Sequence, residues 1–330
     1  MFMNTDVHMG PQVRQFDIAG WFGRYGTILS LVLLLVVFSA LEPRVFPTFA
    51  NLINVLEQIS IQGTISAGLT ICLIMGLYDL SIAAMVTLGG YLCPLFLTVA
   101  PLPALLGIAL TLFVAAAIGA LNGAIVSYMG ISAFIATLAM GSILTGVVLG
   151  ISGSQSIVSG IPDSFMVIGQ GDIAGIPVAV IIMLLVVLLF WVVSEHTQFG
   201  RTLCAIGSNA EASRLAGIAT KRYPPAALAI CAVCSALGGV MVSSTLGAGR
   251  PENIGDPYLL NAFASVFIGA STLRPGRFHI LGTMVGVLLI GVIDNGLSIL
   301  GVATFWQYIV QGLLLISSLF ASGILKLRKA

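Results

Sequence analysis

Long uninterrupted runs of apolar residues make up most of the sequence, and short polar segments separate them. No charged residue occurs between Asp79 and Asp163. One membrane crossing needs about 20 apolar residues, so this stretch alone has room for about four helices. The runs are continuous and do not alternate with polar positions. This favours helices over the short alternating strands of a membrane barrel.

The pattern predicts an all-α, polytopic membrane protein with about ten transmembrane helices, within a range of about 8 to 11. Residues 1–26 are expected to form a cytoplasmic or interfacial segment, because they are polar and lack the short apolar core of a cleavable signal. Residues 27–325 are expected to form a single transmembrane domain, and 326–330 a basic cytoplasmic tail. The predicted spans, of which the second, third and eighth are short or contain glycine, are 27–41, 61–77, 82–99, 102–128, 132–151, 176–194, 225–246, 260–272, 280–300 and 305–325.

Composition supports a membrane protein. The 330 residues include 13 Lys or Arg and 12 Asp or Glu, and 58% are hydrophobic. A soluble chain of this length would carry roughly 80 charges, at about 25% charged. Mean hydropathy is +1.10. Because a single soluble core stops growing at roughly 250–300 residues, the composition excludes a soluble enzyme, a nucleic-acid binder and a disordered chain.

The basic residues predict the orientation, because cytoplasmic loops carry an excess of Lys and Arg. With the N-terminus inside, only Arg44 and Arg250 fall on the outer side. Both termini are therefore expected in the cytoplasm, with an even number of spans. The basic residues that fall on the inner side are Arg14, Arg24, Arg201, Arg214, Lys221, Arg222, Arg274, Arg277, Lys326, Arg328 and Lys329.

The sequence has no recognisable catalytic or cofactor-binding motif. A P-loop needs a lysine directly after its spaced glycines, and the chain has only Lys221, Lys326 and Lys329, none of which follows such a pattern. The chain is therefore not expected to hydrolyse ATP by itself. We predict no catalytic residue, no metal site and no cofactor in this chain. Asp79 and Asp294 are the carboxylates closest to predicted mid-membrane positions, and they leave open an ion-coupled secondary transporter.

One predicted cytoplasmic loop, residues 195–222, contains a segment at 197–218 whose residues predict a short helix. Asn209 is a good N-cap, Glu211 suits the positive end of a helix dipole, and Gly217 is a natural stop. Such a short helix is unstable alone. It is either a connector packed on its own bundle or a docking element for another protein, and Arg214 would extend that docking surface.

Small residues recur at positions that suggest close helix contacts and an internal repeat. The G-x-x-x-G pairs are Gly119/Gly123, Gly146/Gly150 and Gly282/Gly286. Two pairs of segments share matching residues at similar spacing, and we call each pair an echo. One echo relates the segment 76–89 to 269–282. Another relates 122–134 to 295–305, at a smaller offset. The two echoes imply different helix directions, so one of them arises by chance or one span is miscounted.

Six segments in order resemble the permease subunit of bacterial ABC importers of the ribose/xylose/galactose type. These segments are 51–60, Gly-Leu-Tyr-Asp-Leu-Ser at 76–81, Asn-Gly at 122–123 with Phe-Ile-Ala-Thr-Leu at 134–138, the loop 197–218, the loop 269–276, and Asn-Gly at 295–296 with Phe-Trp-Gln at 305–307. The second glycine of the family's GGIDLS motif is Leu77 here, and one Asn of its NNG motif is Asp294. These departures leave the solute open.

The resemblance implies a type II ABC importer in the bacterial inner membrane. It implies four partners: a second permease subunit, identical or a paralogue; a cytoplasmic ATPase that carries ATP and Mg; a periplasmic solute-binding protein; and a monosaccharide or similar small polar solute. The helix between Asn209 and Gly217 would be the coupling element that the ATPase moves. The ATPase-coupling residues would be Arg201, Asn209, Glu211, Arg214 and Gly217. The candidate pathway residues are Asp79, Asn122, Phe134, Asp294, Asn295 and Gln307.

Overall fold

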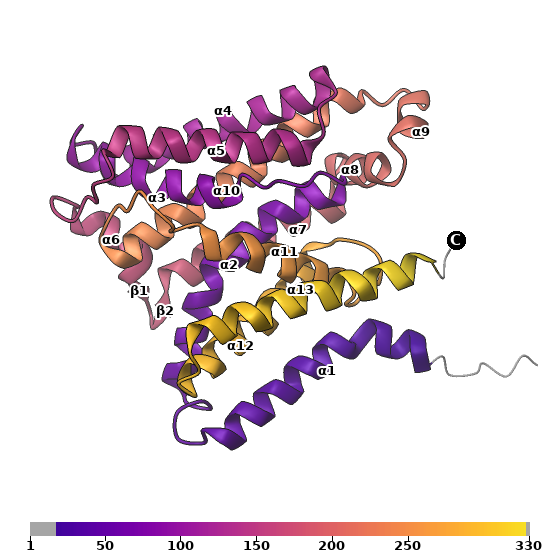
Figure 1. Ribbon diagram of the computed structural model, residues 1–330, viewed down its shortest axis with the longest axis horizontal. Coiled ribbons are helices and arrows are strands. Elements are labelled where there is room, and N and C mark those ends of the chain that lie inside the picture. Colours follow the sequence, from indigo (N-terminus) through magenta and orange to yellow (C-terminus); the bar gives the residue numbers. More distant parts are fainter. Residues whose placement is uncertain (1–17, 328–330) are drawn as a thin grey trace, which may run out of the picture.

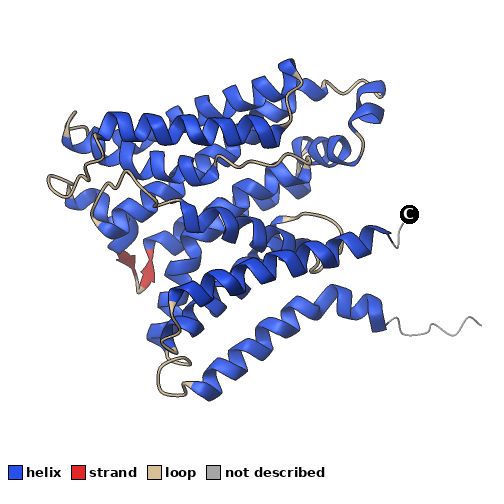
Figure 2. Cartoon of the chain, viewed as in Figure 1, coloured by secondary structure: helices blue, strands red, loops and turns tan. Residues whose placement is uncertain are grey.

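Helices form most of the protein (Figures 1 and 2). The computed structural model describes residues 18–327, and side chains over 25–317. The elements are α1 Ile18–Leu41, α2 Phe49–Ile74, α3 Ile82–Thr98, α4 Ala104–Met129, α5 Ala133–Ser152, α6 Asp163–Gln170, β1 Asp172–Ile173, β2 Ile176–Pro177, α7 Val178–His196, α8 Gln198–Ser208, α9 Ala210–Leu215, α10 Tyr223–Leu246, α11 Asp256–Ala270, α12 Ile280–Ile299 and α13 Thr304–Leu327.

Each of the ten predicted spans overlaps one long helix, and these helices are α1–α5, α7 and α10–α13. Within the described residues, α4, α5, α7, α10 and α12 are long and apolar enough to cross a membrane. The total of ten crossings stays a prediction. Residues 1–17 and 328–330, which include parts of the predicted end segments, lie outside the description. Helix α1 already includes Ile18, the first described residue, nine positions before the predicted start.

The second predicted span was too short, because α2 has 26 residues and begins at Phe49. The polar side chains early in this helix hid its start from the hydropathy pattern. The Thr48 side chain accepts a hydrogen bond from the Asn51 amide at 3.2 Å and so caps the helix. Segments that the hydropathy pattern did not predict as elements are α6, α8 and the β1–β2 hairpin.

Both ends of the described chain lie at one end of the molecule. Helix α1 begins and α13 ends at the end where α8 and α9 lie, and α6 and the β1–β2 hairpin lie at the opposite end (Figure 1). An ion pair between Arg274 and Glu195, at 2.6 Å, fastens the α11–α12 loop to the last turn of α7. We call the end with α8 and α9 the inner end, following the orientation that the basic residues predict.

Two of the long helices, α3 and α11, are only 17 and 15 residues long. Each follows a non-helical segment that runs back into the bundle, 75–81 before α3 and 247–255 before α11 (Figure 1). Their N-terminal ends meet inside the protein. The Gly255 amide donates to the Thr87 hydroxyl at 3.2 Å, and a Cβ at Gly255 would collide with the backbone of Ala83.

The helix order supports one of the two sequence echoes. The series α2–α3–α4–α5 is repeated by α10–α11–α12–α13, and the second series runs in the opposite direction through the bundle (Figure 1). The echo between 122–134 and 295–305 pairs α4 with α12 and α5 with α13, in agreement with this order. The echo between 76–89 and 269–282 pairs the start of α3 with the start of α12 and does not fit it.

Two of the three G-x-x-x-G pairs make close helix contacts within the chain. Gly119 and Gly123 let α4 approach α10 at Leu228 and Pro225, and Gly282 lies against Gly269 of α11. At Gly146 and Gly150 of α5, added Cβ atoms would meet nothing within 4 Å among the described atoms. The α5 pair is therefore available to a partner outside the chain.

Replacing Thr137 by valine is expected to destabilise the fold by about 1–3 kcal/mol, because the Leu80 amide donates to the Thr137 hydroxyl at 2.9 Å and would lose that partner. Thr145→Val is the matched control on the same helix, since that hydroxyl bonds only to the Gly141 carbonyl one turn away. Thermal unfolding in nanodiscs measures both. Equal unfolding temperatures for the two variants would contradict this role of Thr137.

Candidate functional site

An exposed pair of helices, α8 and α9, lies at the inner end. Helix α8 buries Leu203 and Ile206 against the bundle and exposes Arg201 on its other side. Gly207 fits against the Ile74 carbonyl at the end of α2, where a side chain would have no room. The pair is therefore fixed to a membrane helix and can transmit a displacement to it.

The predicted local structure of α9 is confirmed. The Asn209 side chain accepts a hydrogen bond from the Ala212 amide at 2.9 Å, as an N-cap does. Gly217 has φ +85°, a conformation that glycine adopts without strain and that ends the helix. Helix α9 ends slightly earlier than predicted, at Leu215. Its predicted coupling role stays a prediction.

The solvent face of α9 carries a charged pair and an apolar side chain. Arg214 and Glu211 form a two-bonded ion pair, with Nη2–Oε1 at 2.6 Å and Nε–Oε2 at 3.1 Å. The hydrogen bonds and positive charge of Arg214 lower the pKa of Glu211, so the pair is lost only as the pH falls through that lowered pKa. Leu215 is 78% exposed beside this pair. Leu215 and the ion pair together form part of the solvent-exposed surface of α9.

A second candidate site lies where α3 and α11 meet, and segment 247–255 forms part of it. The sequence placed this segment in an outer loop. The structure corrects this, because the segment turns inward and its residues Glu252 and Asn253 line two separate hollows. Its backbone follows α3, with Gly249 against Pro94 and Gly255 against Ala83.

One hollow is a groove along α5, which we call the α5 groove. Its lining residues are Leu80, Ala83, Ala84, Thr87, Leu138, Gly141, Ser142, Thr145, Leu149, Pro251, Glu252, Asn253 and Asp256. Glu252 and Asp256 are exposed beside the central residues of α5. Ionisable groups at such a depth do not face lipid but line water-filled paths or protein contacts. The groove therefore needs a cover other than lipid.

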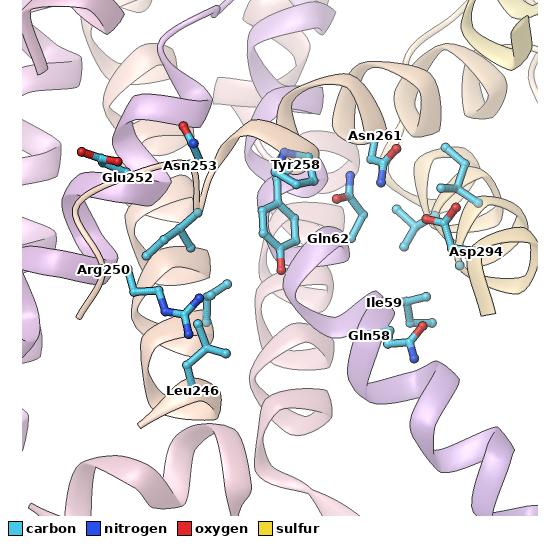
Figure 3. A pocket seen from close by; sticks show the side chains of 16 residues that line it. Gln58, Ile59, Gln62, Leu246, Arg250, Glu252, Asn253, Tyr258, Asn261 and Asp294 are labelled. Carbon is cyan, nitrogen blue, oxygen red and sulfur yellow. The ribbon is translucent and has the colours of Figure 1, made fainter. Parts of the chain in front are cut away.

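The other hollow is a cavity of about 450 Å³, which we call the amide cavity (Figure 3). It lies between α2, α10, α11 and α12. Its lining residues are Gln58, Ile59, Gln62, Val242, Leu246, Arg250, Glu252, Asn253, Ile254, Pro257, Tyr258, Asn261, Val287, Ile290, Gly291 and Asp294.

The structure does not bring the six candidate pathway residues into one site. Asp294 alone lines the amide cavity, where Gln311 donates to its carboxylate at 3.0 Å. Asp79 is buried, and its carboxylate accepts hydrogen bonds from the amide and hydroxyl of Ser81, at the start of α3. Asp79 therefore supports the broken backbone at this point.

The other candidates lie apart from both hollows. Asn295 accepts from Asn51 at 3.0 Å and so joins α12 to α2. Gln307 donates to Ser298 at 3.2 Å. Phe134 is exposed near the start of α5. Asn122 is buried in α4, and neither atom of its amide has a partner.

Sequence reasoning missed the residues that define the hollows. Gln62 and Asn261 lie inside predicted spans. They were not predicted as site residues because they carry no charge. Their amide character within apolar runs was the available signal. Glu252 and Asp256 follow Arg250, which the count of basic residues places on the outer side, and hydropathy does not reveal that this loop turns back into the bundle.

These features define a predominantly helical membrane protein with two polar hollows in its interior. The chain belongs to the family described as the permease component of the branched-chain amino acid transport system, which matches residues 51–319. Proteins of this family are permease subunits of ABC importers in the inner membrane and are not enzymes, since ATPase activity resides in a separate subunit.

Curated relatives are similar over nearly their whole length. The ribose import permease of Bacillus subtilis (strain 168) is 34% identical over 316 residues, 95% of this chain and 97% of the relative. The ribose import permease of Escherichia coli (strain K12) is 32% identical over 92% of this chain and 94% of its own. The D-allose permease of the same strain is 32% identical over 92% and 93%. No solved structure matches the chain significantly.

Replacing Asn209 by alanine is expected to destabilise α9 by about 1 kcal/mol, because the first turn loses its cap. Hydrogen exchange at the amides of 212–215 should become severalfold faster. Ser208→Ala is the control, since the Ser208 hydroxyl bonds only to the Cys204 carbonyl within α8. Unchanged exchange in Asn209→Ala would show that the cap does not hold α9.

Proposed function

We propose that this chain is the permease subunit of an ATP-driven importer that moves a monosaccharide or similar small polar solute across the bacterial inner membrane. The observation that carries the proposal is the α8–α9 pair, fixed to α2 at Gly207 and exposing Leu215 and the Glu211–Arg214 pair. A chain without an ATP site needs such a surface to receive work from an ATPase. The ribose and allose permeases among its relatives support a sugar as the solute.

The proposed mechanism joins the two ends of the molecule. A soluble binding protein delivers the solute at the outer end, where α6 and the β1–β2 hairpin lie. ATP binding closes a pair of cytoplasmic ATPase subunits, and each ATPase moves a docked α8–α9 pair. Because α8 is fixed to α2, the movement rocks the bundle between outward-open and inward-open states. The ATPase holds ATP and Mg, and this chain needs no cofactor.

A second permease subunit, identical or a paralogue, covers the α5 groove in this proposal. Two observations support this. The groove carries Glu252 and Asp256, which lipid cannot solvate. The small-residue face at Gly146 and Gly150 of α5 is open to a close helix approach from outside the chain. The covered groove then becomes a polar path between the subunits.

The ion-coupled alternative receives less support from the geometry. Asp79 is hydrogen-bonded at the start of α3, and Asp294 is held by Gln311. The family is one of ATP-driven importers. Uptake that persists after ATP depletion and collapses with the proton gradient would favour the alternative.

Leu215→Asp is expected to lower ATP turnover of the co-purified ATPase by about tenfold or more, since a central apolar docking contact would become charged. Exchanging the charges, Glu211→Arg with Arg214→Glu, keeps an ion pair within the helix but reverses the charges that the ATPase contacts. This double variant should reduce ATP turnover as well. Solute-stimulated ATP hydrolysis in proteoliposomes is the measurement.

The matched control for this docking test is Val158→Asp, an exposed aliphatic residue in the loop between α5 and α6. It should leave co-purification of the ATPase unchanged. Normal docking and turnover in both α9 variants would remove the basis for the coupling role of α9.

A cysteine at Gly146, on a Cys204→Ser background, is expected to cross-link to the partner permease with a short bis-maleimide, because the α5 face would lie at the subunit contact. Leu185→Cys on α7 is the control, since that side chain is exposed on a different helix. A cross-linked dimer on denaturing gels is the readout. Cross-linking from position 185 and not from 146 would place the second subunit elsewhere.

A further inference from the structure

The amide cavity is separate from the α5 groove and lies within a single chain. Segment 247–255 divides the two hollows, and Glu252 and Asn253 touch both. The cavity volume of about 450 Å³ is within the range of small-molecule sites, roughly 300–1,000 Å³. A bare ion would leave most of this volume unfilled.

Two of the residues that line this cavity each have a buried polar atom without a hydrogen-bond partner. These atoms are Gln62 Oε1, on a residue 6% exposed, and Asn261 Oδ1, on a residue 8% exposed. A buried polar atom without a partner costs about 1–3 kcal/mol, so each one requires an explanation such as strain, an ordered water or a bound group. The position of these two residues on the wall of a cavity favours a bound group. The amide nitrogen of Gln62 is already used, because it donates to Ser66 at 3.2 Å. This bond fixes Gln62 with its oxygen as the free acceptor.

The two amides line the same cavity. In the view of Figure 3, Gln62 and Asn261 lie between Tyr258 and Asp294. Gln62, Asn261 and Asp294 come from three different helices, α2, α11 and α12, so the cavity is built by the tertiary structure. The Asp294 carboxylate adds further acceptor positions, and Tyr258 contributes a flat apolar ring.

This set of groups suits a ligand that donates several hydrogen bonds and carries no negative charge. Sugar hydroxyls donate to amide and carboxylate oxygens, and the apolar face of a sugar ring packs on an aromatic ring. Arg250 is the only cationic side chain among the lining residues, against Glu252 and Asp294. An anion would therefore meet more negative than positive charge.

We propose that the amide cavity is a binding site for a neutral monosaccharide within the permease chain itself, with Gln62 and Asn261 as its hydrogen-bond acceptors. The proposal rests on the proposed function for the identity of the solute class. It adds a place where the solute resides inside one subunit, in addition to the path between subunits.

The test uses the full chain in lipid nanodiscs, without ATPase or binding protein. D-ribose and D-galactose are the probes, D-gluconate is the anionic probe, and saturation-transfer NMR measures binding. Gln62→Met and Asn261→Leu are each expected to weaken binding of the neutral sugars by about tenfold, because each removes one acceptor while filling the same space. D-gluconate should bind at least tenfold more weakly than D-galactose.

Asn122→Leu is the matched control. Asn122 is also a buried amide without a partner, but it lies in α4 outside both hollows. Its replacement should leave sugar binding unchanged. Absence of sugar binding to the unmodified chain, or equal weakening by all three substitutions, would overturn the proposal.

A second measurement does not depend on altering the two amides. On a Cys204→Ser background, a cysteine at Gln58, which lines the cavity, should react with maleimide several times more slowly when D-ribose or D-galactose is present. A cysteine at Glu57, exposed but outside the cavity, should react at the same rate with and without sugar. Equal rates at position 58 would overturn the site.

The outcomes separate this inference from the proposed function. ATP-driven sugar uptake by an assembled transporter whose permease shows no sugar binding would overturn the cavity site and leave the proposed function standing. Sugar binding that depends on Gln62 and Asn261, in a chain that supports no ATP-driven uptake, would support the cavity site and count against the proposed function.

Discussion

The structure depends on how two breaks in helical backbone are satisfied inside a membrane protein. Irregular backbone at membrane depth is tolerated only where protein or a water-filled cavity supplies its hydrogen bonds. Segment 75–81 receives them from Asp79 and from Thr137, and segment 247–255 receives one from Thr87. Glycine at 255 lets the two half-length helices α3 and α11 meet. Without these contacts neither helix could begin in the interior, and neither hollow would exist.

Two parts of this architecture differ in character: the inner end is rigid, and the interior is polar. At the inner end, α8 is held rigidly against α2, so a force on α9 reaches a long helix. In the interior, segment 247–255 carries polar side chains away from lipid and lines both the α5 groove and the amide cavity. A polar interior and a rigid inner surface are what an importer subunit without its own ATP site requires.

Sequence reasoning succeeded where a property is local. Apolar run length located all ten long helices, and capping rules located α9 between Asn209 and Gly217. It failed for properties that depend on distant contacts. Asp79 and Asn295 were predicted as pathway residues because they are polar positions in segments that resemble the family's motifs, yet their side chains hold backbone or join helices. Gln62 and Asn261 are polar residues within apolar runs, and only their place in one cavity distinguishes them.

The sequence by itself determined that this protein is a helical membrane protein and that it belongs to a family of permeases. The positions of its basic residues also predict its orientation in the membrane. These follow from run length, charge position and ordered motifs, all of which are read along one dimension. Only the tertiary structure decided that segment 247–255 turns inward and that amides about 200 positions apart share one cavity. The reason is physical: a cavity is defined by distances between helices, and hydropathy contains no such distances.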